Sequence, residues 1–171
     1  MSVYIALGAN LSSKDEAGNA VPPAQTFDSA ARALKARGVN TAEVSALWQS
    51  PAWPPGSDQP DYINACARIS TRLDAREALL ALHDVEREFG RERGAKNAAR
   101  PLDLDLLDYK GQVISGSDIQ VPHPRMLSRG FVLFPLSEVA PHWADPVHGI
   151  EIWDWIARLP LADVTPMRRL S

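Results

Sequence analysis

Five consecutive residues, Leu102-Asp103-Leu104-Asp105-Leu106, alternate strictly between leucine and aspartate. Side chains of a β-strand point alternately to its two faces, so this alternation predicts a strand that buries its leucines. Asp103 and Asp105 would then share the opposite face, with their Cα atoms about 6 to 7 Å apart. The chain must therefore build a sheet with one apolar face and one face that carries two carboxylates.

The apolar periodicity elsewhere predicts where this strand sits in a fold. Period-two segments predict strands and segments of helical period predict helices. The predicted order is strand, helix, strand, strand, helix, strand, over residues 3–7, 27–38, 43–49, 62–70, 74–90 and 102–106. This order is typical of an α+β, ferredoxin-like β-α-β-β-α-β fold with a largely antiparallel sheet and helices on one face.

The segments outside these six elements are expected to form loops and a few additional short elements. Residues 12–25 are rich in Ser, Asp, Gly, Asn and Pro, which predicts a loop, and four prolines stiffen the connector at 50–60. Past the last strand of the unit we expect C-terminal additions. They are a strand near 112–114, a proline-containing crossing at 121–124, and helices near 130–139 and 150–159.

Composition bounds the class of protein. A chain of 171 residues with 45% hydrophobic residues is expected to form one domain over residues 1–171. A net charge of −3 provides no overall attraction to nucleic acid or to an acidic membrane surface. The single cysteine, Cys66, excludes an internal disulfide framework, and residues 1–10 lack the pattern of a secretory signal. No apolar stretch approaches the roughly 20 residues that span a bilayer. A cytoplasmic location follows as an expectation.

The aspartate pair is a candidate magnesium site. Two carboxylates this close repel each other unless a cation lies between them, and hard oxygen ligands suit Mg²⁺. A site with few carboxylates is typical where substrate phosphates complete the coordination. Taken alone, Asp103 and Asp105 fit a solvated strand face better than a metal site, so the interpretation needs support from other segments.

Basic residues stand on both sides of the pair. The segment from Arg87 to Arg100 contains five basic residues and two acidic ones, and arginine forks bind phosphate oxygens. Downstream, His123 lies between two prolines and Arg129 follows it. A histidine so restrained suits a phosphate contact or an acid, although a surface loop and a turn histidine are the plain alternatives.

Tyr62 and Asn64 are predicted to share one face of the strand at 62–70. An aromatic ring beside an amide that donates and accepts hydrogen bonds could hold a flat heterocycle by stacking and by edge hydrogen bonds. The alternative is an ordinary polar sheet face. Cys66 lies two positions further along and is interpreted as a small packed residue.

Four motifs in order carry a family resemblance. They are Tyr4-Ile5-Ala6-Leu7-Gly8-Ala9-Asn10-Leu11, Gln59-Pro60-Asp61-Tyr62-Ile63-Asn64-Ala65, Arg100-Pro101-Leu102-Asp103-Leu104-Asp105-Leu106, and Val121-Pro122-His123-Pro124 with Arg129-Gly130-Phe131. Together they resemble the 6-hydroxymethyl-7,8-dihydropterin pyrophosphokinases of folate biosynthesis. The resemblance implies a monomer that transfers the β,γ-diphosphate of ATP to the pterin hydroxymethyl group and releases AMP.

The resemblance also implies a role for each matching position. Asp103 and Asp105 match the ligands of two magnesium ions and count, with Arg91, Arg100 and His123, as the catalytic set. The expected ATP contacts are Glu86, Arg91, Arg100, Leu106, Ile119, His123 and Arg129. The expected pterin contacts are Ser50, Pro51, Tyr62, Asn64 and Phe131, with the backbone of Trp53-Pro54 at the edge.

Some questions stay open at this stage. Either aspartate could accept the proton of the attacking hydroxyl. The chain departs from the family pattern at Asn97-Ala98-Ala99, His83, Asp118 and Pro124, which affects secondary ATP contacts and makes a tryptophan lid doubtful. The alternatives are another Mg²⁺-dependent nucleotidyl- or phosphoryl-transferase and a ferredoxin-like binding module without catalysis.

Overall fold

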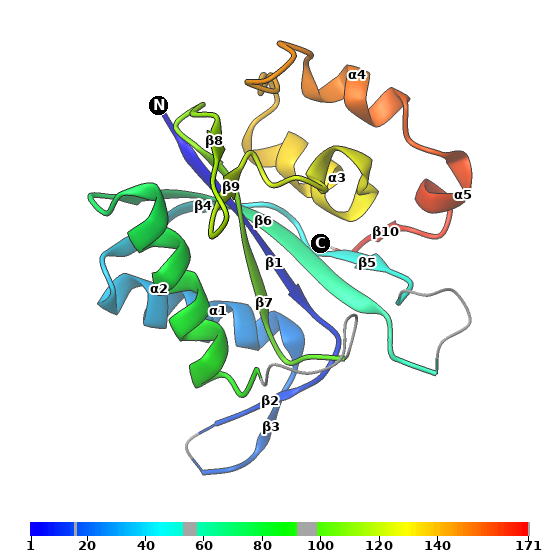
Figure 1. Cartoon of the computed structure of the whole chain (residues 1–171). Helices are drawn as coiled ribbons and strands as arrows, with labels where there is room; N and C mark the ends of the chain where they lie inside the picture. The colour runs from blue at the N-terminus through cyan, green and yellow to red at the C-terminus, as the bar shows by residue number, and fades with distance from the viewer. Residues whose placement is uncertain (16, 53–57, 92–98, 171) are drawn as a thin grey trace.

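An antiparallel sheet forms the centre of the protein in the computed structural model, which describes residues 1–15, 17–52, 58–91 and 99–170 (Figure 1). The strands of this sheet are β1 Val3–Ala9, β4 Val39–Val44, β5 Trp48–Ser50, β6 Tyr62–Thr71, β7 Asp103–Tyr109 and β10 Arg168–Arg169. Their order is β10-β5-β6-β1-β7, and β4 pairs with another part of β6. The two central strands, β6 and β1, are antiparallel neighbours, and β7 pairs with the free side of β1. This order confirms the predicted ferredoxin-like α+β fold.

Helices cover both faces of the sheet (Figure 1). Helices α1 Pro23–Ala36 and α2 Ala75–Glu88 pack on one face. The short helix η1 Met126–Ser128 and helices α3 Gly130–Val139 and α4 Ile152–Ala157 cover the other, and α5 Leu161–Val164 follows. No helix within the described ranges is both long enough and apolar enough to cross a membrane.

Each face of the sheet has its own hydrophobic core, and β7 contributes to both. Leu104 and Leu106 are buried against α1 and α2, as the alternation predicts. Leu107 is buried in the second core with α3. It is an extra residue, since the register between β1 and β7 passes from Leu106 to Asp108 at this point. The bulge ends the alternating stretch just after Leu106. Both aspartates lie before it, on the face opposite Leu104 and Leu106, which is the α3 face.

The predicted strand at 43–49 is wrong as a single element. Strand β4 begins before this segment and ends within it at Val44, β5 begins at Trp48, and residues 45–47 lie outside both strands. The Ser45 hydroxyl accepts from the backbone N–H of Cys66 at 3.0 Å, and the Glu138 carboxylate accepts from the backbone N–H of Ala46 at 2.7 Å. Side-chain acceptors therefore take backbone N–H groups that would otherwise pair between strands. The alternation of apolar and polar residues in the sequence gives no sign of this.

Two other boundaries differ from the prediction. Part of the predicted loop at 12–25 is a hairpin, β2 Ser13–Lys14 with β3 Ala20–Val21, and α1 begins at Pro23. Proline is tolerated in the first turn because its missing N–H would have had no helical partner. The predicted strand at 112–114 is displaced to β8 Ile114–Ser115, which pairs with β9 Gln120–Val121.

Helix α2, which carries part of the site, begins at a capping box. The Asp74 side chain accepts from the Glu77 backbone N–H at 2.9 Å, and the Glu77 side chain accepts from the Asp74 backbone N–H at 2.8 Å. These bonds satisfy donors that the first helical turn leaves without partners.

Replacement of the cap should therefore destabilise the protein. We expect Asp74→Ala to lower the free energy of unfolding by about 1 kcal/mol, measured by urea denaturation. Asp84→Ala, which removes an exposed carboxylate paired with Arg87 on the same helix, should cost less than about 0.5 kcal/mol. Equal losses in the two variants would contradict the importance of the cap.

Candidate active site

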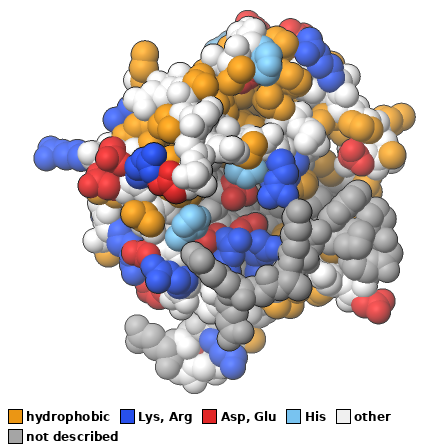
Figure 2. Space-filling model, in the orientation of Figure 1, with side chains coloured by type: hydrophobic (Ala, Val, Ile, Leu, Met, Phe, Trp, Pro, Cys, Tyr) orange, Lys and Arg blue, Asp and Glu red, His pale blue; other side chains and the backbone are white. Residues whose placement is uncertain are grey.

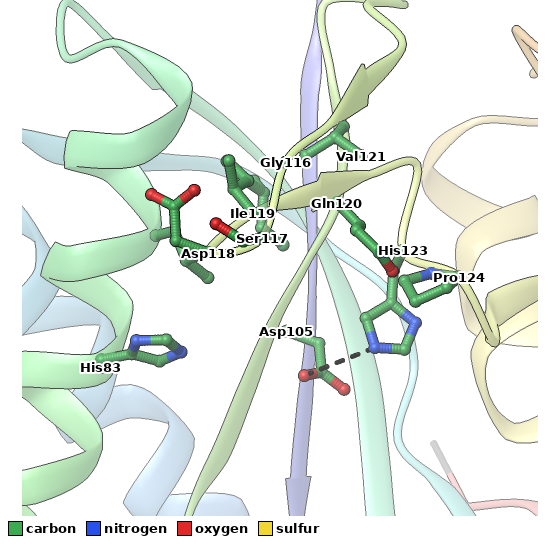
Figure 3. Close-up of a pocket in the computed structure, with 12 residues that line it drawn as sticks. His83, Asp105, Gly116, Ser117, Asp118, Ile119, Gln120, Val121, His123 and Pro124 are labelled. Atoms are coloured by element: carbon green, nitrogen blue, oxygen red, sulfur yellow. Dashed lines mark ion pairs between the residues drawn. The ribbon is translucent and has the colours of Figure 1, made fainter.

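A cavity of about 1570 Å³ opens on the α3 face of the sheet, where the strands carry their polar side chains. Figure 2 shows acidic, basic and histidine side chains gathering at the centre of the view, between α2 and the segment before α3. A second cavity of about 390 Å³ lies beside the first, between α2 and the β8–β9 hairpin (Figure 3). Asp105 and His83 line both cavities, so the two adjoin at these side chains.

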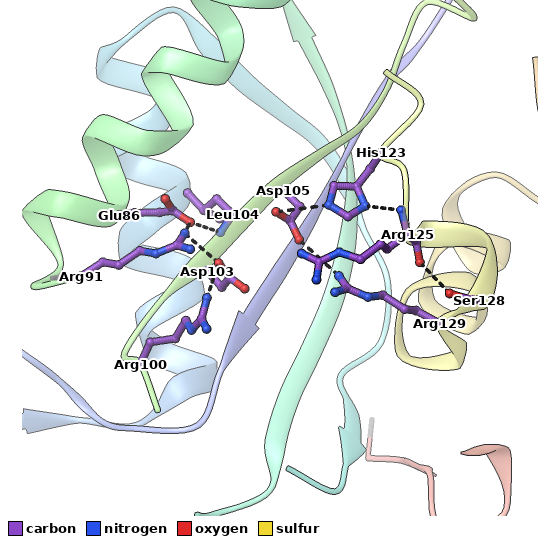
Figure 4. Close-up of polar contacts among 10 residues, drawn as sticks. All are labelled: Glu86, Arg91, Arg100, Asp103, Leu104, Asp105, His123, Arg125, Ser128 and Arg129. Carbon is purple, nitrogen blue, oxygen red and sulfur yellow. Dashed lines mark hydrogen bonds and ion pairs between the residues drawn. The ribbon is translucent and has the colours of Figure 1, made fainter. Parts of the chain in front are cut away.

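Asp103 is held between two arginines (Figure 4). Its Oδ1 lies 2.7 Å from Nη1 of Arg91 and 3.2 Å from Nη1 of Arg100. Arg91 follows α2 and Arg100 precedes β7, so the two ends of the loop that joins these elements meet at one carboxylate. The predicted proximity of the basic segment and the aspartate pair is therefore seen at both of its described ends.

Asp105 faces a histidine and an arginine from the segment before α3. Its Oδ1 is 3.9 Å from Nε2 of His123, and its Oδ2 is 3.8 Å from Nη1 of Arg129. These distances exceed those of direct hydrogen bonds, so the attraction is electrostatic. The guanidinium of Arg129 also lies over the ring of Phe131, 5.4 Å from its centre.

The geometry of His123 indicates which nitrogen carries the proton in its neutral form. The backbone N–H of Arg125 donates to Nδ1 at 3.3 Å, which leaves Nε2 to carry the hydrogen toward Asp105. Burial lowers the pKa of His123, although the Asp105 carboxylate opposes this shift. The backbone N–H of His123 also donates to the carbonyl of Leu107 at 2.9 Å, which ties the turn to β7.

Glu86 of α2 is a buried carboxyl that contacts both β7 and one of the arginines of the site. Only 3% of its side chain is exposed, and its Oε1 accepts from the backbone N–H of Leu104 at 2.7 Å and pairs with Arg91. Burial raises the pKa of Glu86 to about 7, against the lowering effects of the Leu104 N–H and of Arg91. Glu86 therefore joins α2 to β7 between the two aspartates and holds the Arg91 guanidinium in place.

Asn10, at the end of β1, positions the other loop arginine. Its Oδ1 accepts from the backbone N–H of Arg100 at 2.8 Å, and its Nδ2 donates to the carbonyl of Pro60 at 3.2 Å. Asn10 as a whole is 4% exposed. One amide therefore links the entry to β7 with the entry to β6, where Tyr62 stands.

Asn64 lies beside the aspartates, across a glycine. On β1, Gly8 pairs with Asn64 on one side and Asp103 on the other. A Cβ at Gly8 would lie 3.7 Å from Asn64 Oδ1 and 3.8 Å from Asp103 Cβ, so the absent side chain leaves the floor between them open. Asn64 Nδ2 donates to Ser50 Oγ at 2.9 Å, which leaves Oδ1 on the Gly8 side.

Tyr62 completes this wall of the cavity. Burial raises the pKa of its hydroxyl, while Arg100, which also hydrogen-bonds it, acts in the opposite direction. All five side chains expected at a pterin site line the cavity that also contains the aspartates: Ser50, Pro51, Tyr62, Asn64 and Phe131.

The second cavity has an apolar floor and a charged rim. Leu106 and Ile119, both expected at a nucleotide base, line it and are buried. Asp118 at the rim pairs with Arg76 of α2, and both side chains are more than half exposed. The residue that departs from the family pattern is thus neutralised by an arginine from the neighbouring helix.

The other residues expected at the site are either found beside the aspartates or lie outside the described residues. Arg91, Arg100, His123 and Arg129 do lie around the carboxylates, whereas Trp53, Pro54, Asn97 and Ala98 fall outside the described residues. Arg125 was missed, although it lines the large cavity and its side chain lies near Asp105 in Figure 4. Its position two residues after His123 was an available signal. The bridging roles of Asn10 and Gly8 had no local signal, because they depend on strand register.

The donor set at the aspartates bears on the metal that could be held. Among the residues that the structure describes, no group of three or more His, Cys, Asp or Glu is placed to hold a metal ion. Asp103 and Asp105 therefore offer two carboxylates. This set fits Mg²⁺ that takes its other ligands from substrate phosphates and water, since that ion is usually bound by one or two carboxylates in such sites.

Comparison with known proteins places these residues in a family. The model of the 7,8-dihydro-6-hydroxymethylpterin-pyrophosphokinase family matches residues 4–141. The chain is 38% identical over 130 residues to a Synechocystis protein named 2-amino-4-hydroxy-6-hydroxymethyldihydropteridine pyrophosphokinase. It is 35% identical over 141 residues to a Haemophilus influenzae protein of the same name. It is also 37% identical over 137 residues to the mitochondrial folate synthesis bifunctional protein of Arabidopsis thaliana.

The matched region is a different share of each relative. It is 76% of this chain and 66% of the Synechocystis protein, and 82% of both partners for the Haemophilus protein. For the Arabidopsis protein it is 80% of this chain and only 23% of the relative. Several of these relatives are therefore longer than the region they share with this chain.

The buried carboxyl of Glu86 generates a pH prediction for the metal-free protein. Its pKa is raised to about 7, above the value of about 4.3 expected in the unfolded chain, so folding favours the protonated form. The wild-type protein should thus lose stability relative to Glu86→Gln as the pH rises from about 4.5 to beyond 7. Urea denaturation at several pH values measures this difference.

A control separates this effect from the loss of a charge on α2. Glu88→Gln removes an exposed carboxylate that pairs with Arg37, two positions further along the helix. A stability difference between the wild type and Glu86→Gln that does not change with pH would show that Glu86 remains ionised throughout.

Proposed function

The chain belongs to the 7,8-dihydro-6-hydroxymethylpterin-pyrophosphokinase family, and on this premise we propose that it transfers diphosphate from ATP to the hydroxymethyl group of a dihydropterin and releases AMP. One observation carries the proposal. The aspartate pair with its arginines and the Tyr62–Asn64 wall line the same cavity, on either side of Gly8. The phosphates of ATP and the flat ring of the dihydropterin would thus bind next to each other, on either side of Gly8.

Asp103 and Asp105 are the proposed ligands of two magnesium ions. Bound there, Mg²⁺ would neutralise phosphate oxygens and orient the triphosphate for in-line displacement at the β-phosphorus. The two carboxylates are about one third exposed or less, so they can reach ligands in the cavity while their backbone stays in the sheet. Either carboxylate could accept the proton of the attacking hydroxyl.

The arginines and the histidine around the aspartates are the proposed triphosphate contacts. Arg91 and Arg100 now share the oxygen of Asp103, and Arg129 and His123 lie near Asp105. Arginine binds phosphate and carboxylate with the same fork of donors, so these side chains can turn from carboxylate to phosphate. Glu86 would keep Arg91 oriented from behind during this exchange.

The pterin is proposed to bind between Tyr62, Asn64 and Phe131. Because Ser50 accepts from Nδ2 of Asn64, Oδ1 stays on the Gly8 side as an acceptor. The relatives' substrate name includes a 2-amino group, which would be a matching donor. The aromatic rings of Tyr62 and Phe131 would contact the faces of the heterocycle.

The base of ATP is proposed to occupy the smaller cavity. Its buried floor, Leu106 and Ile119, provides apolar contact, and the cavity opens onto Asp105 and His123. The triphosphate would then extend from this cavity toward Asp103 and the pterin.

We further propose that residues 1–171 act as one domain and as a monomer in a cytoplasmic, reducing environment. The two cores lie on opposite faces of one sheet, which supports a single folding unit. Cys66 is free and buried, which suits a reducing environment.

The proposed activity predicts a specific pair of products. Incubation with ATP, Mg²⁺ and 6-hydroxymethyl-7,8-dihydropterin should yield AMP and the pterin diphosphate in equal amounts, measured by ion-exchange chromatography. ADP or free pyrophosphate as the pterin-dependent product would favour another transferase. Binding of both ligands without any product would favour a module without catalysis.

Removal of either carboxylate should abolish turnover while the fold is kept. We expect Asp103→Asn and Asp105→Asn each to lower kcat by roughly 100-fold or more, because each removes charge that holds the metal at the developing phosphate charge. Asp28→Asn, on the exposed surface of α1, is the matched control and should keep the wild-type rate. If both site variants kept more than a few per cent of kcat, the metal assignment would be wrong.

A further inference from the structure

The C-terminal segment, residues 159–170, lies outside the part of the chain that the family model matches, residues 4–141. It nevertheless lines the large cavity on the side of Phe131. Four of its residues take part in this lining: Ala162, Asp163, Pro166 and Met167. Part of the cavity wall is therefore built by a segment for which the family comparison assigns no role.

The segment is attached to the sheet at the strand that carries Ser50. Strand β10 pairs antiparallel with β5, with Arg168 opposite Gln49 and Arg169 opposite Trp48. The backbone N–H of Leu170 donates to the carbonyl of Leu47 at 2.8 Å. Figure 1 shows this segment passing from α5 back to β5 at the edge of the sheet. The cavity-lining residues are thus fixed at their C-terminal end by a strand pairing.

Glu138 of α3 strengthens the same attachment. Its Oε1 accepts from Nε of Arg169 at 2.9 Å and from Nε1 of Trp48 at 3.2 Å, and its Oε2 accepts from the backbone N–H of Ala46 at 2.7 Å. One carboxylate therefore joins β10, β5 and the connection before β5. The Trp48 ring also stacks on Phe134 of α3, with 5.2 Å between the ring centres.

Met167 reaches from this anchored segment to the first residue of α3. Its Sδ would lie 2.9 Å from a Cβ placed on Gly130, which is closer than real Cβ contacts. Glycine at 130 is thus what lets the thioether approach the backbone between Arg129 and Phe131. Met167 is only partly buried and lines the cavity, so it does not merely fill the core.

We propose that Met167 is a specificity-determining contact for the pterin, and that the C-terminal segment completes the heterocycle pocket beside Phe131. The inference rests on the proposed function and adds a wall to the same site. A thioether is polarizable and adapts its shape, and sulfur makes favourable contacts with aromatic rings. It suits a flat heterocycle held between Tyr62 and Phe131.

The test is a comparison of three full-length variants. Met167→Ala should raise the KM for hydroxymethyl dihydropterin by roughly tenfold, as expected for the loss of about 1.4 kcal/mol of contact. The Kd for the pterin should rise by the same factor. It is measured by calorimetric titration in the presence of Mg²⁺ and a non-hydrolysable ATP analogue. The KM for ATP should stay within twofold of wild type. Met167→Leu, which keeps the volume, should restore most of the pterin affinity.

A matched control and a stability measurement exclude a general effect. Leu161→Ala removes a side chain from the same segment that is 79% exposed and outside the cavity lining, and it should leave both KM values unchanged. Thermal denaturation of each variant shows whether the fold is kept. If Met167→Ala raises the KM for ATP as much as that for the pterin, Met167 acts only in packing and the inference is overturned.

The outcomes also separate this inference from the proposed function. Wild-type protein that forms AMP, together with a pterin KM within twofold of wild type in Met167→Ala, overturns the inference alone. Wild-type protein that forms no AMP and binds no pterin overturns both. Should Met167→Ala fail to fold, Met167→Gln, which keeps the length of the side chain but makes its end polar, replaces it. A raised KM for the pterin with an unchanged KM for ATP would support the inference, and a pterin KM within twofold of wild type would overturn it.

Discussion

Two like charges on neighbouring positions of one strand face are the constraint around which the structure is arranged. The carboxylates of Asp103 and Asp105 repel each other unless cations lie nearby. The surrounding elements provide them: Arg91 comes from the end of α2, Arg100 from the entry to β7, and Arg129 from the segment before α3. His123 of the same segment points Nε2 toward Asp105. In the proposed function these same cations meet the phosphates of ATP, so a requirement of the protein's own charges prepares the site for its ligand.

The second half of the site depends on strand register. Gly8 stands between Asn64 and Asp103 because β1 pairs with β6 on one side and β7 on the other. A shift of either pairing by one residue would turn the polar face into the apolar core. Asn10 then joins the entries of β6 and β7, the two neighbours of β1, through a single amide. The wall beside Phe131 is completed by Met167, which β10 and Glu138 hold against Gly130.

Sequence patterns predicted the elements with strong periodicity and missed those set by side chains from distant positions. The strands at β1, β6 and β7 and the cap of α2 follow from local spacing, and the structure confirms them. The single strand expected at 43–49 was wrong because side chains interrupt the pairing there. The Ser45 hydroxyl accepts from the Cys66 N–H of β6, and the Glu138 carboxylate, more than 90 residues away, accepts from the Ala46 N–H. The family resemblance, carried by four motifs, is confirmed by the match over residues 4–141.

By itself, the sequence determined the alternation of β7, the fold class and the kinds of side chain at the site, because these depend on local periodicity and on residue chemistry. Only the tertiary structure decided which cations face which aspartate, and that Asn64 lies across Gly8 from Asp103. Only the tertiary structure also brought the C-terminal segment to the cavity. The reason is physical: these contacts join residues far apart in the chain, and their distances follow from sheet register and helix packing, which no local spacing encodes.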